Sequence, residues 1–331
     1  MKYTSLLLVI LFSIILTACS SKEVFEPKLV SGDWKNSGDA SKEIIDTTLD
    51  AALLDNREVF IDNNTTGIFI EENHRLIASS DGWIISSNID GNLTLQFITD
   101  KSMVETFELG KTIATASIKD NTLAVLFADN EMALYAISTK ELLFKEQGSA
   151  PIIVNAKIVK PYFMNDLVLF LTLDGKIVIA NVAQKKKLRT IIVSSEDHFN
   201  NIISFNLVED KLIAITGTKL LSFAQQEIRT KYEIRDVFYD DRVIYITTKQ
   251  GDIVSLTPEL QVIAKAKFPF AHFLGLISYK DKLYALEKEG YLIEASKDLL
   301  TYDVFEVDLD DGFVYISDKI FYVGEEYISV E

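Results

Sequence analysis

The chain has 331 residues, and 48% of them are hydrophobic, which is enough for a substantial core. Its 49 acidic residues outnumber its 33 basic residues, and the net charge of −16 argues against binding to nucleic acid and to anionic lipid. A single cysteine, Cys19, excludes an internal disulfide bond.

Residues 1–18 have the pattern of a lipoprotein signal peptide. Lys2 supplies a positive charge, and residues 5–16 form an apolar run that is too short to span a membrane but suits a signal-peptide core. The run ends in LTAC at residues 16–19, which resembles the bacterial lipobox. We therefore expect cleavage before Cys19 and acylation of this residue, palmitate included, to give a stable membrane anchor. The alternative is a secretory peptide with an incidental cysteine.

The residues after Cys19 bear on the location of the mature chain. In enteric bacteria, an aspartate directly after the lipidated cysteine retains a lipoprotein in the inner membrane. This chain has Ser20 and Ser21 there instead. Their presence favours the outer membrane, so we expect a chain anchored there with its body at the periplasmic face.

Residues 19–55 are predicted to be a tether. Residues 20–40 are polar, contain Gly, Pro and Ser, and show no period. Within residues 41–54, apolar and small residues recur at helical spacing, which predicts a short amphipathic helix docked on the domain; these are Ile44, Ile45, Thr48, Leu49, Ala52 and Leu53. An irregular segment leading into the first strand fits as well.

Residues 56–331 are predicted to form one all-β domain built from a repeated hairpin. Each copy has a polar turn, an apolar run, a second turn and another apolar run. The copies begin at His74, Asn121, Asp166, Asp210, Asp241, Asp281 and Asp311. The second turns contain Gly82, Asn130, Gly175, Gly217, Gly251, Gly290 and Asp318, which are residue types that tolerate the positive φ of tight hairpins.

The spacing of the copies predicts a β-propeller. The copies are about 40 residues apart on average, which is the length of a four-stranded blade. Seven blades fit the domain best, six or eight also fit, and a β-sandwich array is the structural alternative. We expect the strand at residues 57–61 to pair with the last blade and close the ring, because closure removes exposed strand edges.

Three stretches resemble the repeats of PQQ-type propellers. Residues 131–144 (EMALYAISTKELLF) match the strand–turn–strand pattern best, and residues 176–189 and 252–261 are weaker copies. A lipoprotein with such repeats resembles the BamB-like propellers, which serve the assembly of outer-membrane β-barrels. The closing aromatic of each repeat is Phe144 or missing, and the Thr-Gly turn has become Thr139-Lys140. PQQ dehydrogenases also use adjacent cysteines, which this chain lacks, so the resemblance implies the scaffold without the cofactor.

Polar clusters give little indication of catalysis or metal binding. His74, His198 and His272 are too scattered for a metal site, and neither a nucleophile motif nor a phosphate loop occurs. Acid pairs that suggest calcium fall at predicted turns and are explained by hairpin chemistry; they are Glu209-Asp210, Asp240-Asp241 and Asp310-Asp311. We expect no cofactor and no metal.

One basic cluster and two sequons remain. Lys185, Lys186, Lys187 and Arg189 form either a solvated loop or a docking point for an acidic partner. Asn64 and Asn92 lie in D-x-N-x-T, which resembles the extended acceptor sequon of bacterial oligosaccharyltransferases; turn-forming Asp-Asn runs are the alternative.

These observations predict a non-enzymatic scaffold lipoprotein that binds protein partners, with components of outer-membrane assembly as the most concrete candidates. Partner-binding residues cannot be assigned from the sequence. The alternatives are a ligand-binding or enzymatic propeller that uses its central channel, and a surface adhesin or antigen.

Overall fold

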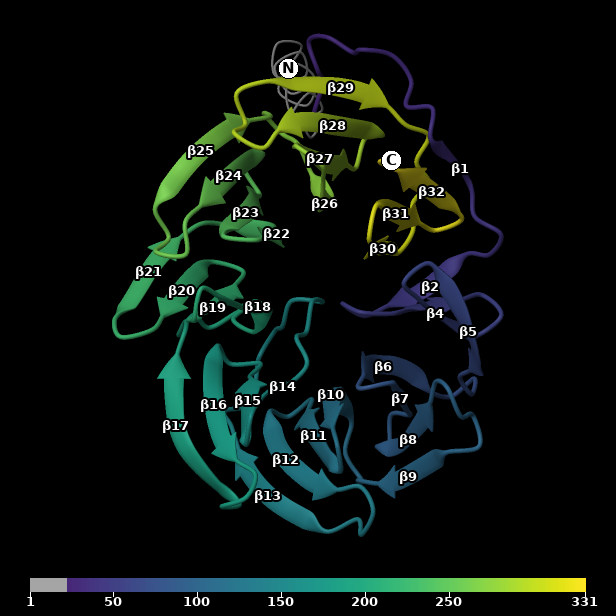
Figure 1. Ribbon diagram of the computed structural model, residues 1–331, viewed down its shortest axis with the longest axis vertical. Coiled ribbons are helices and arrows are strands. Elements are labelled where there is room, and N and C mark those ends of the chain that lie inside the picture. Colours follow the sequence, from purple (N-terminus) through teal and green to yellow (C-terminus); the bar gives the residue numbers. More distant parts are fainter. Residues whose placement is uncertain (1–22) are drawn as a thin grey trace, which may run out of the picture.

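The computed structural model describes residues 23–331, which form a ring of eight four-stranded antiparallel sheets around a central axis (Figure 1). This part of the chain contains no helix, so no helix in it has the length and hydrophobicity needed to cross a membrane. Cys19 and the predicted signal peptide lie outside the described residues. The prediction of an all-β propeller is confirmed.

Each blade is a meander whose strands follow one another outward from the axis (Figure 1). Blade 1 contains β2 (Ile44–Thr47), β3 (Ala52–Leu54), β4 (Glu58–Ile61) and β5 (Asn64–Phe69). Blade 2 contains β6 (Arg75–Ser80), β7 (Trp83–Ser87), β8 (Asn92–Phe97) and β9 (Val104–Glu108). Blade 3 contains β10 (Ile113–Lys119), β11 (Thr122–Phe127), β12 (Glu131–Ala136) and β13 (Leu142–Gln147). Blade 4 contains β14 (Tyr162–Met164), β15 (Leu167–Leu171), β16 (Lys176–Asn181) and β17 (Lys186–Ile192).

The second half of the ring continues in the same way and ends with a composite blade. Blade 5 contains β18 (Ile202–Val208), β19 (Lys211–Thr216), β20 (Lys219–Phe223) and β21 (Glu227–Lys231). Blade 6 contains β22 (Ile234–Asp240), β23 (Val243–Thr248), β24 (Asp252–Leu256) and β25 (Val262–Lys267). Blade 7 contains β26 (Phe273–Tyr279), β27 (Lys282–Glu287), β28 (Tyr291–Ser296) and β29 (Tyr302–Glu306). Blade 8 contains β30 (Val314–Ser317), β31 (Ile320–Val323), β32 (Glu326–Ser329) and β1 (Ser37–Asp39).

The core lies between neighbouring blades. In most blades the second strand and much of the third are covered on both faces, and β11 and β24 are buried along almost their whole length. This explains their continuous apolar sequences, since a strand that is buried on both faces needs no polar alternation. The outermost strands alternate or are mostly exposed, as β17 and β25 show.

The predicted turn residues occupy the hairpins for the expected reason. Gly82, Gly175, Gly251 and Gly290 have φ near +80°, and Asn130 and Asp318 also have positive φ. Gly217 is the exception, because its φ is not positive. Tight hairpins favour this backbone region, and glycine enters it without the steric cost of a Cβ.

The expected number of seven blades is corrected to eight. The seven hairpin copies correspond to blades 2 to 8, and the additional blade is blade 1. Its first two strands replace the helix that we expected at residues 41–54: β2 and β3 pair as an antiparallel hairpin. Propeller strands therefore begin well before residue 56, within the segment expected to be a tether.

The ring closes at a different segment from the one expected. Residues 57–61 lie inside blade 1, where β4 pairs with β3 and β5. The closing strand is β1, which pairs antiparallel with β32 through Ser37–Ile328 and Asp39–Glu326. An N-terminal strand thus completes the C-terminal blade and covers an edge that would otherwise be exposed.

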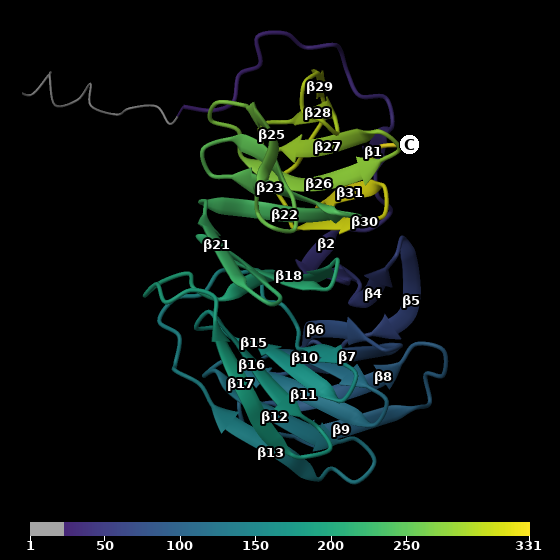
Figure 2. The same cartoon turned by 60° about the vertical axis from the view of Figure 1, so that its left-hand side comes forward.

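Residues 23–36, which we call the N-terminal strap, pack along the outside of blade 7 before they reach β1. Figure 2 shows the strap passing over β29 and descending to β1. The backbone N–H of Ser31 donates to Val304 O (2.7 Å), and that of Trp34 donates to Glu306 O (2.8 Å). Asp33 and Glu306 form a parallel bridge, so the strap acts as a short fifth strand on blade 7.

Candidate functional site

A loop enters the centre of the ring, the region where a propeller enzyme would hold its substrate. This loop, residues 148–161, connects β13 to β14 and reaches the middle of the ring (Figure 1). Lys157 pairs with Asp236 of β22. Lys160 pairs with Asp50 of the β2–β3 turn and donates to Ser79 O of β6. The two lysines therefore tie the channel loop to three different blades.

A buried asparagine holds the channel loop through hydrogen bonds to its backbone. Asn201 is fully buried, and its Nδ2 donates to Lys157 O (2.7 Å) and to Asn155 O (3.3 Å). Its Oδ1 accepts from the backbone N–H of Asn155 (2.6 Å). Sequence reasoning missed Asn201 and the channel loop, because a lone asparagine after an irregular segment has no distinguishing pattern.

The cavities that remain beside the channel loop are small or open. One of about 130 Å³ is lined by Lys157, Arg235, Asp236 and Phe205, among others. A second, of about 460 Å³, opens beside Lys160 and is lined by Asp50, Asp62, Asp81 and Asp318. Asp236 in the first cavity and Asp50 in the second are paired with the lysines of the loop, so each cavity holds an ion pair that a substrate would have to displace.

We expect the double variant Lys157→Ala/Lys160→Ala to loosen the channel loop while the ring stays folded. Partly exposed ion pairs contribute about 1 kcal/mol or less each, whereas the ring is held by the blade interfaces. Limited proteolysis followed by mass spectrometry should therefore show faster cleavage within residues 148–161. Lys185→Ala, which removes an exposed pair with Glu141, is the matched control. Equal cleavage rates in the two variants would contradict the bracing role.

A polar cluster around the buried Glu287 joins blades 6 and 7. Arg235 Nη1 lies 2.8 Å from His272 Nε2, and the backbone N–H of His272 donates to Glu287 Oε1 (2.7 Å). The N–H of Glu289 donates to Glu287 Oε2 (2.7 Å). Burial raises the pKa of Glu287 and lowers that of Arg235. Because these hydrogen bonds satisfy both carboxylate oxygens, the cluster is explained as a junction between blades.

The other histidines and the acid pairs, which were not predicted to form a metal site, are dispersed. His74 is buried with Nδ1 3.3 Å from Ser86 Oγ, and His198 is exposed between β17 and β18. Glu209-Asp210 and Asp240-Asp241 fall at the first hairpin turns of blades 5 and 6, whereas Asp310-Asp311 lies in the connection between blades 7 and 8. Within residues 23–331, no group of three or more histidine or acidic side chains is arranged to hold a metal ion.

Three members of the basic cluster, all but Lys186, form ion pairs with neighbouring blades. Lys185 pairs with Glu141 (2.7 Å), Lys187 with Glu146, and Arg189 with Glu227 at 3.8 Å. These pairs link the outer parts of blades 3, 4 and 5. The cluster therefore links three blades on the outer surface of the ring. Because most of its charges are already paired within the chain, it is less suited to dock an acidic partner.

Both sequon asparagines are exposed. Asn64 is the first residue of β5 and donates through Nδ2 to Asp62 O (2.6 Å), which is the contact of a turn-forming residue. Asn92 is the first residue of β8. Exposure is required for modification and also fits a turn, so glycosylation of Asn64 and Asn92 stays a prediction.

Glu58 in β4 is a buried carboxylate that accepts three hydrogen bonds within blade 1. Lys42 Nζ lies 2.9 Å from Glu58 Oε2, Asn56 Nδ2 donates to the same oxygen (3.3 Å), and the N–H of Gly67 donates to Oε1 (3.1 Å). The hydrogen bond from Lys42 is the main reason why the pKa of Glu58 lies below its ordinary value of 4.5.

Because the folded state lowers this pKa, the pair stabilises the fold above pH 4.5, and the stabilisation is lost as the pH falls through the folded pKa. Lys42→Met should therefore cost about 1 kcal/mol at neutral pH and progressively less in acid. Urea denaturation across this pH range measures the difference from the wild type. Lys35→Met, at an exposed lysine of the strap, is the control. A difference that stays constant with pH would contradict the assignment.

Comparison with known proteins gives relatives in sequence and in fold. No family model matches the chain. The plasminogen-binding proteins PgbB of Helicobacter pylori strains J99 and 26695 are 34% and 33% identical to it over 235 residues, which cover 66% of this chain and 42% of each relative. The chain thus spans less than half the length of the curated relatives that it matches.

Solved structures show the same architecture at low sequence identity. BamB from Moraxella catarrhalis has a TM-score of 0.68 and 11% identity, over 89% of this chain and 98% of that chain. The C-terminal WD40 domain of Sif2 has a TM-score of 0.64 with 11% identity (90% and 99% covered), and the designed protein Ika8 has 0.60 with 11% identity (92% and 100% covered). At this identity the likeness shows the fold alone, which is a BamB-like propeller, as the sequence resemblance predicted.

Proposed function

We propose that this chain is a non-enzymatic lipoprotein of the bacterial cell envelope whose propeller binds a protein partner, with plasminogen as the first candidate. The observation that carries this proposal is the 34% identity to a plasminogen-binding protein over 235 residues. A match of that length includes several blades, so the similarity extends over the propeller body. It gives weight to the surface adhesin that the sequence left as an alternative.

The channel supports a binding role over a catalytic one. Lys157 and Lys160 hold a loop at the centre of the ring, and both lysines are paired with acids of other blades. A substrate would have to displace this loop and break its ion pairs. The outer surface of the ring is the more accessible place for a partner.

The outer strands offer that partner apolar contacts and free edges. Most blades carry an exposed large apolar side chain on the outermost strand; examples are Phe69, Val104, Leu142, Ile192, Ile228, Val262 and Tyr302. Except at blade 7, where the strap already pairs with β29, an extended segment of a partner can pair with such an edge through its backbone and place side chains on these residues.

A role in the assembly of outer-membrane β-barrels is the second candidate, and the fold likeness to BamB favours it. In this role the same outer edges would receive a partner subunit or an unfolded barrel strand. The two candidates differ in the side of the membrane that the propeller faces, and the proposed anchor at Cys19 is compatible with either side.

Binding and crosslinking measurements separate the candidates. The lipidated full chain, purified in detergent, should bind immobilised plasminogen saturably in surface plasmon resonance and should not bind serum albumin. Chemical crosslinking in intact cells, followed by mass spectrometry, should recover barrel-assembly components if the second candidate holds. Absence of plasminogen binding together with absence of any specific crosslinked protein would overturn the proposed binding function.

The anchor has its own test. Cys19→Ala should leave an unprocessed precursor without palmitate, because the thiol that takes the lipid is gone. Palmitate labelling of the wild type and the variant in the native host measures this. Equal labelling of the two proteins would rule out Cys19 as the anchor.

A further inference from the structure

The N-terminal strap fixes the place at which the propeller meets its anchor. Phe25 is almost fully buried and packs edge-on against Phe268 (6.1 Å between ring centroids) and Tyr291 (5.6 Å). These contacts hold the start of the strap to blades 6 and 7. Only residues 20–24 separate Phe25 from Cys19. Fully extended, that stretch reaches about 20 Å, so a lipid on Cys19 keeps this side of the ring close to the bilayer.

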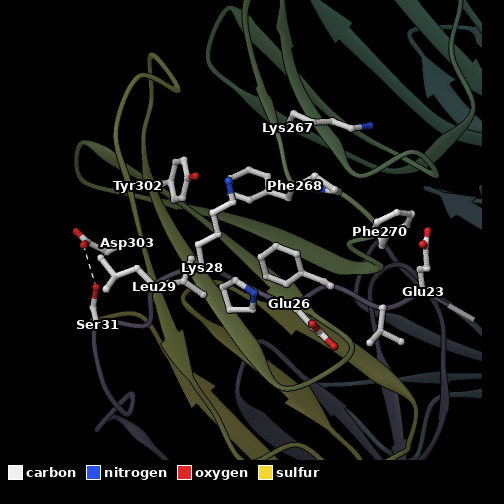
Figure 3. Close-up of a pocket in the computed structure, with 15 residues that line it drawn as sticks. Glu23, Glu26, Lys28, Leu29, Ser31, Lys267, Phe268, Phe270, Tyr302 and Asp303 are labelled. Carbon is white, nitrogen blue, oxygen red and sulfur yellow. Dashed lines mark hydrogen bonds between the residues drawn. The ribbon is translucent and has the colours of Figure 1, made fainter. Parts of the chain in front are cut away.

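The same side of the ring carries a group of exposed apolar residues. A cleft of about 990 Å³ lies between part of the strap and blades 6 and 7, and Figure 3 shows Lys28 of the strap extending toward Phe268 and Tyr302 while Leu29 lies beside Asp303. Leu29 is 78% exposed, Tyr302 53% and Phe270 54%. Leu300, in the turn before β29, is 80% exposed.

The charges around the cleft are mixed. Lys28 and Lys267 line it together with Glu23, Glu26 and Asp303. Asp303 accepts from Ser31 Oγ (3.0 Å), and Lys267 lies 3.3 Å from Asp252. Because no excess of positive charge gathers here, attraction to anionic lipid does not explain this surface. Large apolar and aromatic side chains instead suit the interfacial region of a bilayer, where they enter between the headgroups.

We propose that the side of the propeller formed by the strap and blades 6 and 7 lies against the lipid surface, with Leu29, Phe270, Leu300 and Tyr302 in the interfacial region. This inference rests on the proposed lipid anchor and adds an orientation to it. Blade 3 lies across the ring from blade 7 (Figure 1), so it points away from the bilayer and stays open to a protein partner.

The test uses the lipidated full chain in vesicles of phosphatidylethanolamine and phosphatidylglycerol. The thiol of an acylated Cys19 is blocked, so an introduced cysteine is the one thiol available for an environment-sensitive fluorophore. Phe270→Cys and Leu300→Cys place the label on the proposed contact surface. Leu142→Cys, on the outer strand of blade 3, is the matched control, because this leucine is also an exposed apolar residue.

We expect lipids with a spin label near the headgroup to quench the fluorophore at positions 270 and 300 at least about twofold more than at position 142. Equal quenching at the three positions, or stronger quenching at 142, would overturn the orientation while leaving the anchor in place. Mass spectrometry of the same samples reports the lipid on Cys19. Its absence would overturn the anchor, and the orientation with it.

Discussion

A chain that lacks residues 23–39 should lose its cooperative melting transition and aggregate. Removing β1 leaves β32 of blade 8 with an unpaired edge, and removing the strap uncovers β29 of blade 7. In a ring of blades each unit draws its stability from its neighbours, so one missing seal exposes two surfaces at once. Urea denaturation and size-exclusion chromatography of residues 40–331, compared with residues 23–331, measure the effect.

Trp34 allows the same seal to be weakened by a single substitution. Its ring packs against Tyr284 (5.9 Å) and Phe305 (5.0 Å) of blade 7, and its Nε1 donates to Ser329 O (2.8 Å) of blade 8. Trp34→Ala should therefore cost about 3 kcal/mol of unfolding free energy. Leu29→Ala, at an exposed position of the same strap, should cost little. If residues 40–331 unfold at the same urea concentration as residues 23–331, β1 and the strap do not seal the ring.

The repeated hairpin made blades 2 to 8 predictable from the sequence. Blade 1, which lacks the repeat, was not predictable. In blades 2 to 8, turn residues such as Gly82 and Asp318 recur with strands of Ile, Val, Leu and Phe between them, because each blade must turn tightly and bury its middle strands on both faces. Blade 1 lacks that regularity. Its strand β3 has three residues, and the apolar residues of β2 and β3 happen to fall at helical spacing.

The ring closure was wrongly assigned for a related reason. The sequence predicted a strand at residues 57–61, and the structure has one there, β4. Strand propensity, however, does not identify the strand with which it pairs. The true closing strand, β1, is the short polar sequence SGD. It follows Trp34, whose Nε1 donates to Ser329 O, and Asn36, whose Nδ2 donates to Glu331 O and whose carbonyl accepts from the N–H of Ser329. Long-range pairings of this kind leave no local pattern. The same holds for the channel loop, whose lysines pair with acids from distant blades.

Gly251→Ala should be among the most destabilising single substitutions in the ring. Gly251 has φ +80°, and a Cβ at this position would lie 2.0 Å from Phe268 O and 3.1 Å from Ala271 N. Both contacts are with backbone atoms. The N–H of Gly251 donates to Thr248 O (3.0 Å), and the carbonyl of Gly251 accepts from the N–H of Phe268 (2.7 Å). A shift of either backbone segment to relieve the clash would therefore weaken these hydrogen bonds. The clash reaches Phe268, against which Phe25 of the strap packs.

Gly110→Ala separates this clash from the cost of the backbone conformation alone. Gly110 also has positive φ, +68°, but nothing lies within 4 Å of the Cβ that it would gain. Alanine there should cost about 1 kcal/mol or less, because left-handed strain is partly offset by the reduced entropy of the unfolded chain. Gly251→Ala adds overpacking against fixed backbone and should cost about 3 kcal/mol or more. Urea denaturation of the two variants measures the gap. If the two variants lose the same free energy of unfolding, the β23–β24 turn of blade 6 relaxes to admit the Cβ. Phe268 would then be less tightly packed beneath the strap than its contacts indicate.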